Sequence, residues 1–157
     1  MQNKTIFLAI FIFQLAIGKA QTVAEANTKK PMDKIIFVAG GGLNKTYINY
    51  VAGLTNKPNP KICFVPTATG DSPNTILNWY TNCEDLPIRP YVMRSFINSN
   101  TTLQSFEETI MSMDAIIVGG GNTLNMMAIW KVQGIDVALR KAYEKGIILA
   151  GGSAGSL

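Results

Sequence analysis

Short apolar runs alternate with amphipathic stretches along most of this chain. The apolar runs have the length of strands buried on both faces, and they occupy residues 34–39, 61–65, 88–93, 114–118 and 147–150. Spacings and capping residues between them predict helices at 46–54, 73–83, 101–111, 123–131 and 135–145. Strands that alternate with helices build β-α-β units, so the pattern predicts an α/β fold with an open, doubly wound and mostly parallel sheet.

Three of the predicted strands end in glycine clusters, which begin at Gly40, Gly119 and Gly151. The carboxyl ends of parallel strands lie on one edge of a sheet, and ligands of such folds bind outside that edge. The glycines are therefore expected to converge on one site. Gly40–Gly42 is not a dinucleotide-binding loop, because the third glycine of that fingerprint is missing.

The last cluster has the sequence of a nucleophile elbow. Gly151-Gly152-Ser153-Ala154-Gly155 follows the apolar run 147–150, which is the strand context that a Gly-x-Ser-x-Gly motif requires. Ser153 would stand on a sharp turn as a nucleophile. The Ala154 N–H and an N–H of the 119–121 loop, at Gly120, would form an oxyanion hole. The alternative is structural, since glycines at strand ends also serve tight turns for conformational reasons alone.

The residue composition limits which metal ligands, catalytic bases and disulfides the chain can supply. The chain contains no histidine, so a zinc site is not expected and neither metal nor cofactor is predicted. Lysine is then the available candidate base, but nothing in the sequence directs Lys131 or Lys145 toward Ser153. Cys63 and Cys83 indicate no disulfide framework and are expected to be packing residues.

The amino-terminal segment has the pattern of a secretory signal peptide. Lys4 precedes an apolar stretch at 6–17, and Gly18-Lys19-Ala20 supplies small residues at a cleavage site. We expect cleavage after Ala20, export, a polar leader at 21–33 and one domain at 34–157, without stable membrane association after cleavage. An uncleaved anchor is the alternative, although the apolar stretch is short for a membrane span.

The net charge also argues against one class of partner. The formal net charge is +4, and Lys4 and Lys19 would leave with the signal peptide, so a mature excess of +2 remains. No basic cluster is interleaved with aromatic residues, and nucleic acid is not expected as a partner.

Two motifs in this order resemble the peptidase E family of serine peptidases, which includes cyanophycinases. They are Val118-Gly119-Gly120-Gly121-Asn122-Thr123-Leu124 and Gly151-Gly152-Ser153-Ala154-Gly155-Ser156, and the strand end Phe64-Val65-Pro66-Thr67-Ala68 is also similar. The resemblance covers residues 34–157 and implies a class I glutamine amidotransferase-like fold of the flavodoxin-like kind. It also implies a Ser153 nucleophile, oxyanion donors at Gly120 and Ala154, and a substrate-side loop of Gly119, Gly121 and Asn122. Short aspartyl peptides are the implied substrates.

The histidine and acidic partners of that family lie after the elbow, and nothing in this chain can be mapped onto them. We therefore interpret the chain as the amino-terminal portion of a longer protein and expect it to be inactive by itself. The alternatives are an inactive truncated paralogue and a non-catalytic amidotransferase-like module that binds a small ligand at the glycine-lined edge. A histidine shortly beyond the elbow, followed by an acid, would favour the peptidase.

Overall fold

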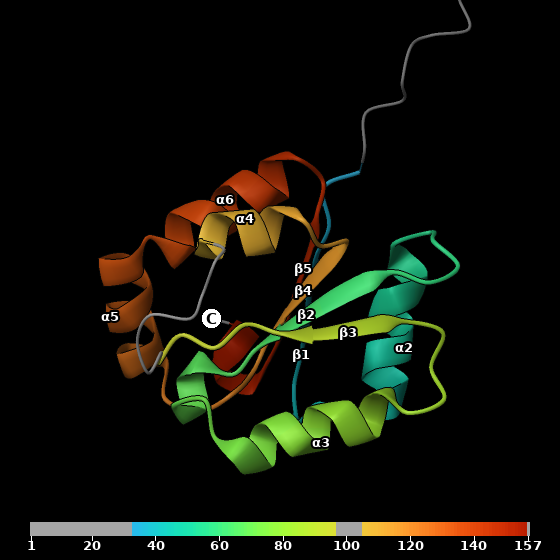
Figure 1. Cartoon of the computed structure of the whole chain (residues 1–157), viewed down its shortest axis with the longest axis horizontal. Coiled ribbons are helices and arrows are strands. Elements are labelled where there is room, and N and C mark those ends of the chain that lie inside the picture. Colours follow the sequence, from blue (N-terminus) through green and yellow to red (C-terminus); the bar gives the residue numbers. More distant parts are fainter. Residues whose placement is uncertain (1–32, 97–104, 157) are drawn as a thin grey trace, which may run out of the picture. The chain divides into compact units, whose positions relative to one another are not determined.

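Five parallel strands form one sheet in the order β1-β5-β4-β2-β3 (Figure 1). The strands are β1 (Ile36–Ala39), β2 (Lys61–Val65), β3 (Arg89–Val92), β4 (Ala115–Val118) and β5 (Ile148–Gly152). The computed structural model describes residues 33–96 and 105–156. The predicted signal peptide, and all of the predicted leader except Asp33, lie outside these residues.

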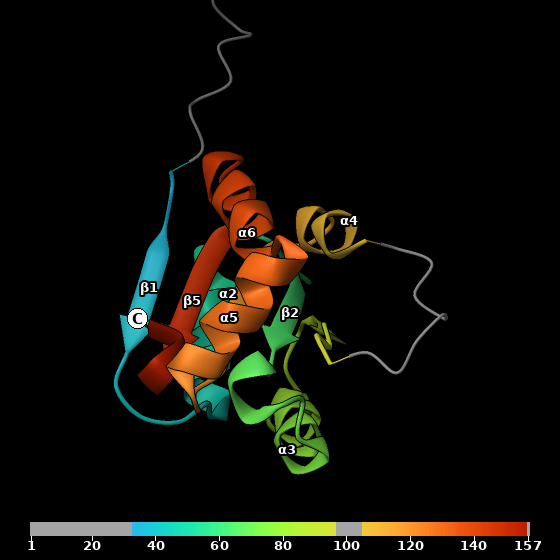
Figure 2. The same cartoon turned by 90° about the vertical axis from the view of Figure 1, so that its left-hand side faces the viewer.

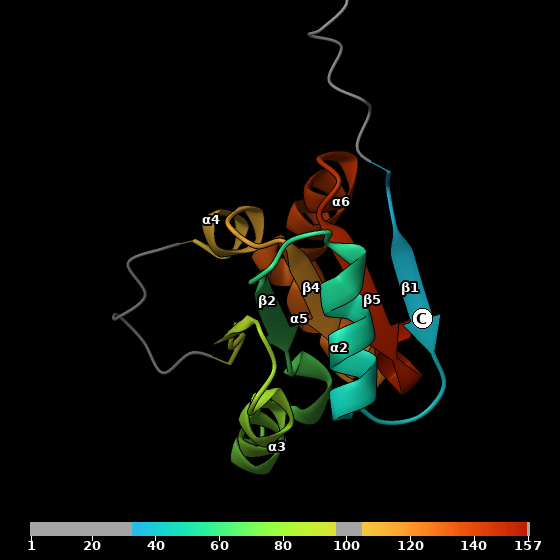
Figure 3. The same cartoon turned by 90° about the vertical axis from the view of Figure 1, so that its right-hand side faces the viewer.

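Helices cover both faces of the sheet (Figures 2 and 3). One face carries α2 (Lys45–Leu54) and α3 (Pro73–Cys83). The other carries α4 (Phe106–Met111), α5 (Thr123–Gln133) and α6 (Ile135–Glu144). The predicted fold class, a doubly wound parallel α/β sheet, is confirmed. No helix in the described ranges combines the length and the apolar character needed to cross a membrane.

The two faces hold separate hydrophobic clusters because side chains alternate along each strand. In β2, Ile62 and Phe64 pack toward α2 and α3, whereas Cys63 and Val65 pack toward α4, α5 and α6. Cys63 and Cys83 are buried in different clusters, on opposite faces of the sheet, and both are free thiols. Burial raises the pKa of each thiol to about 12, so both are protonated packing residues at neutral pH.

The predicted start of the fourth helix, at Thr101 or Thr102, lies outside the described residues. Within them, α4 begins at Phe106 and Ser105 is its N-cap. Ser105 and Glu108 form a capping box there, in which each side chain accepts a hydrogen bond from the other residue's backbone N–H. The box satisfies the N–H groups of Ser105 and Glu108 and stabilises the start of α4 at Phe106.

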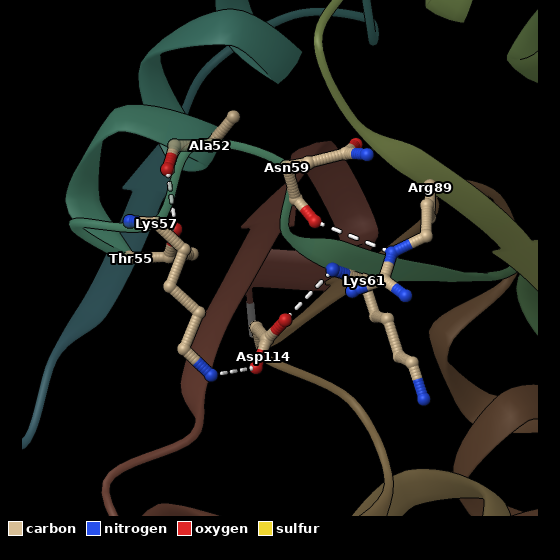
Figure 4. Close-up of polar contacts among 7 residues, drawn as sticks. All are labelled: Ala52, Thr55, Lys57, Asn59, Lys61, Arg89 and Asp114. Carbon is tan, nitrogen blue, oxygen red and sulfur yellow. Dashed lines mark hydrogen bonds and ion pairs between the residues drawn. The ribbon is translucent and has the colours of Figure 1, made fainter.

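Asp114 organises the edge of the sheet opposite the glycine loops (Figure 4). Its side chain, 16% exposed, accepts a 2.7 Å hydrogen bond from the Lys61 N–H and forms an ion pair with Lys57. The backbone N–H of Asp114 donates to the Lys61 carbonyl at 2.9 Å. The carboxylate therefore ties the starts of β2 and β4 to the connection that follows α2.

The same contacts set the acidity of Asp114. Partial burial alone would raise its pKa, but the hydrogen bonds from Lys57 and from the Lys61 N–H outweigh burial. The pKa of Asp114 is therefore held below its ordinary value of 3.8.

We expect Asp114→Asn to lower the free energy of unfolding by about 1–2 kcal/mol at neutral pH, because charge-assisted hydrogen bonds are lost. A carboxylate with a lowered folded-state pKa contributes stability above its unfolded-state pKa and loses it as pH falls through the folded-state value. The difference between wild type and variant should therefore shrink as the pH falls below about 4. Urea unfolding over a pH series measures this.

The matched control is Glu144→Gln, which breaks the exposed ion pair with Lys34 and should cost no more than about 0.5 kcal/mol. If both variants lost the same free energy of unfolding, the structural role of Asp114 would be contradicted.

Candidate active site

The three strands that end in glycine are neighbours in the sheet. β5 lies between β1 and β4, and Gly151 stands beside Val38 on one side and Val118 on the other. Because the strands are parallel and in this register, the loops after Ala39, Val118 and Gly152 leave the sheet side by side. The convergence predicted from the sequence is thus a direct consequence of strand order.

Ser153 has the backbone of a nucleophile elbow. It follows β5, begins the 3₁₀ turn η3 (Ser153–Ser156) and has φ of 53°. A non-glycine residue in this left-handed region carries conformational strain of about 1–3 kcal/mol, which the surrounding structure must hold. Its side chain is exposed, whereas Gly151 and Gly152 before it are buried. The turn therefore exposes the Ser153 hydroxyl at the carboxyl edge of the sheet.

The flanking glycines allow this turn to fold back on the strand ends. A Cβ at Gly151 would lie 1.9 Å from the Gly155 carbonyl oxygen. A Cβ at Gly155 would lie 2.4 Å from the Val118 carbonyl oxygen. No side chain fits at either position, so the first and last residues of the motif are required by backbone packing.

The loop after β4 lies against the serine. A Cβ at Gly120 would be 3.0 Å from the Ser153 Cβ and 3.4 Å from its Oγ, so the Gly120 backbone borders the hydroxyl directly. Gly119 is fitted under the ring of Phe64, where a Cβ would come within 2.9 Å. Gly121 has φ of 143° and packs on the Ala68 carbonyl. These glycines bring main chain, rather than side chains, up to Ser153.

A cavity of about 460 Å³ opens at Ser153. Backbone from the three loops lines one part of it, at Gly41, Gly42, Gly119, Gly120 and Gly152. Leu43, Phe64 and Trp79 form an apolar part, and Thr75, Asn78 and Asn82 of α3 complete the lining. Such a volume suits a small ligand rather than a long chain.

The predicted site residues do not all reach this cavity. Ser153, Gly119 and Gly120 line it, whereas Ala154, Gly121 and Asn122 are not among its lining residues. Ala154 is half-buried in η3, next to the serine. Asn122 caps α5, with its side chain accepting a 2.9 Å hydrogen bond from the Asn125 N–H.

Sequence reasoning missed the contribution of α3. Trp79 is 1% exposed, as a core residue would be, but it also lines the cavity. Thr75, Asn78 and Asn82 follow one face of a helix at i, i+3 and i+7, a polar stripe beside that tryptophan. The stripe was visible in the sequence, but nothing there indicated which face of the sheet α3 covers.

No ionisable side chain lines the cavity within residues 33–96 and 105–156. Lys145 follows α6 at the start of β5, the opposite edge from Ser153, and Lys131 lies in the last turn of α5, remote from the glycine loops. The described part of the chain also has no cluster of three or more His, Cys, Asp or Glu residues that could hold a metal ion. What the arrangement does provide is an exposed Ser153 hydroxyl with the Gly120 backbone beside it.

Comparison with known proteins places these features in a family. The sequence profile of peptidase family S51 matches residues 35–157. A Bacillus subtilis (strain 168) protein named uncharacterized peptidase YgaJ is 39% identical over 131 residues, which cover 80% of this chain and 56% of that protein. The chain thus spans little more than half the length of this relative.

Two solved structures share the fold. A putative peptidase E protein from Listeria monocytogenes EGD-e has a TM-score of 0.57 at 20% identity, covering 78% of this chain and 59% of its own. A peptidase from an acI-B1 Actinobacterium has a TM-score of 0.62 at 20% identity, covering 76% of this chain and 54% of its own. The two structures support the parallel α/β fold.

We expect Gly155→Ala to destabilise the protein by about 2–4 kcal/mol, because the new methyl group would overlap the carbonyls of Val118 and Gly119. Gly53→Ala is the control, since α2 leaves open space there and alanine is the better helix former by about 1 kcal/mol. Thermal or urea unfolding of both variants measures the contrast. A Gly155→Ala protein as stable as wild type would show that the elbow does not pack as described.

Proposed function

Because the chain belongs to peptidase family S51, we propose that it supplies the nucleophile and oxyanion hole of a serine-type peptidase that hydrolyses short peptides. Ser153 carries the proposal: a strained, exposed serine after a buried strand, bordered by the Gly120 backbone at the mouth of a cavity. Family membership supports peptidase activity, and the geometry supports Ser153 as its nucleophile.

In the proposed reaction the Ser153 Oγ attacks the peptide carbonyl carbon while a base takes its proton. The carbonyl oxygen becomes an oxyanion, which accepts hydrogen bonds from backbone N–H groups at Gly120 and Ala154. The C–N bond then breaks, the base returns the proton to the leaving amine, and an acyl-serine ester remains. Water, deprotonated by the same base, hydrolyses the ester and releases the serine.

None of the residues that line the described cavity has a side chain suited to act as this base. The 157 residues contain no histidine, so we propose that the base and its acidic partner come from residues beyond 157. This agrees with the match to peptidase YgaJ, of which the chain covers 56%. The peptidase resemblance supports aspartyl peptides as substrates, the 460 Å³ cavity supports short ones, and the signal-peptide pattern at 1–20 supports action after export.

We expect the protein extended to the end of its reading frame to hydrolyse aspartyl dipeptides, and Ser153→Ala in it to lower kcat/KM by at least about 10³-fold. Ser112→Ala is the control: Ser112 follows α4 and its hydroxyl donates to the Thr109 carbonyl, remote from the cavity. A coupled assay that follows the release of free amino acid measures kcat/KM for both variants. Undiminished turnover in Ser153→Ala would reject the assignment.

The 157-residue chain itself should turn over the same dipeptides near the background rate, because positioned proton transfer contributes about 10²–10⁴-fold. Assays of the mass-verified 157-residue chain and of the extended protein, run side by side, measure the two turnover rates. If neither protein hydrolyses any dipeptide, a non-catalytic module that binds a small ligand becomes the better interpretation.

A further inference from the structure

The loop between β4 and α5 is anchored at both ends on the end of β2 and the turn that follows it. At its start, the Gly119 N–H donates a 3.1 Å hydrogen bond to the Val65 carbonyl. At its end, the Asn122 N–H donates a 2.7 Å hydrogen bond to the Ala68 carbonyl. Gly121 packs on that same carbonyl, where a Cβ would come within 2.2 Å of the oxygen. The position of the loop therefore depends on the position of the turn after β2.

The middle of this loop is the part that borders Ser153. Within residues 33–96 and 105–156, the backbone N–H groups of Gly120 and Gly121 donate to no backbone carbonyl. Donors beside a nucleophile stabilise an oxyanion only while they are held in place, because a displacement of about 1 Å can cost about 10²-fold in rate. A residue that fixes this loop should therefore affect the rate as well as the stability.

A buried polar network fixes the turn after β2. Thr67 lies in this turn, η2 (Thr67–Thr69), and is 1% exposed. Its hydroxyl forms a hydrogen bond with the equally buried hydroxyl of Ser95, and it accepts a 3.0 Å hydrogen bond from the Trp130 Nε1–H. The Gln133 side chain donates a 2.9 Å hydrogen bond to the Ser95 carbonyl. The network thus joins η2, the segment after β3 and α5.

The network and the loop form a closed ring of contacts. Asn122 is the N-cap of α5, and Trp130 lies about two turns further along the same helix. The hydrogen bond between Thr67 and Trp130 ties η2 to α5, and the hydrogen bond between Asn122 and Ala68 ties the same two elements beside the loop. Removing one member of a buried network leaves its partners unsatisfied, so the effect of a deletion reaches beyond a single contact.

We propose that Thr67 is a positioning residue for the reaction at Ser153. Its buried hydroxyl holds η2 against α5, and through the Ala68 carbonyl it holds the Gly120 backbone beside Ser153. Thr67 is not among the residues that line the cavity, so it acts on the oxyanion-binding backbone and not on the substrate. The proposal rests on the proposed function for the role of Ser153, whereas the contact between η2 and the loop is independent of that role.

Steady-state kinetics of the extended protein test the proposal. Thr67→Val keeps the shape of the side chain but removes the hydroxyl, and it should lower kcat about 10-fold while KM changes less than about twofold. An interaction that acts only in the transition state lowers kcat and kcat/KM equally, whereas a distorted cavity would raise KM. Thr67→Ser keeps the hydroxyl and should retain kcat within about threefold of wild type.

Two further variants control for lost stability and for failed folding. Asp114→Asn removes polar contacts at the opposite edge of the sheet, so it should destabilise the protein but leave kcat and KM at their wild-type values. If Thr67→Val does not fold, Trp130→Phe replaces it, because this change removes the Nε1–H donor but keeps an aromatic ring and the pairing of the two hydroxyls. Trp130→Phe should lower kcat in the same way.

Amide hydrogen exchange of the 157-residue chain tests the positioning without catalysis. The exchange rate of the Asn122 amide, divided by that of the Ile148 amide, should rise at least about 10-fold in Thr67→Val. The Ile148 N–H donates to the Asp114 carbonyl at 3.2 Å, at the opposite edge of the sheet, so the ratio cancels a general loss of stability. Thr67→Ser should keep the wild-type ratio.

The outcomes distinguish this proposal from the proposed function. Undiminished turnover in Ser153→Ala rejects the proposed function, and the exchange ratio then still decides whether Thr67 holds the loop. Turnover that depends on Ser153, combined with wild-type kcat in Thr67→Val and Trp130→Phe, overturns the positioning role alone. An effect confined to KM, or an unchanged exchange ratio in both variants, also overturns it.

Discussion

The site depends on main chain packed directly on main chain where the elbow folds back over the sheet. Positions 151 and 155 have no room for a Cβ, because each faces a carbonyl: that of Gly155 in one case and that of Val118 in the other. This contact holds η3 against the end of β4, and with it holds Ser153 at φ of 53°. The strain at the serine persists because rigid neighbours on both sides leave the backbone no relaxed alternative.

A second constraint connects α3 to the same framework. Phe64 is fully buried in β2, and it contacts Gly119 on one side and stacks on Trp79 of α3 on the other. The loop beside Ser153 and the polar face of α3 therefore share one support, although these segments lie far apart in sequence.

Much of this arrangement could be predicted. Buried strand runs, helix caps and glycine clusters indicated a parallel α/β sheet and a site at its carboxyl edge, because each is a local signal with a local physical cause. Asn122 illustrates the point, since its capping role follows from residue type and position alone. The contribution of Thr75, Asn78 and Asn82 was not predicted, because a polar helical stripe looks the same whether it meets solvent or a cavity.

The sequence by itself determined the strands and most of the helix boundaries of this protein, and it identified the residues of the elbow, because propensity, capping and hydrophobic period act over a few residues. The tertiary structure alone decided the strand order. It places β5 between β1 and β4, which brings Gly152 beside the Gly41 carbonyl and Gly120 beside Ser153. It also decided that residues of α3 line the cavity. These are contacts between segments distant in the chain, and their energy comes from packing that no single segment contains.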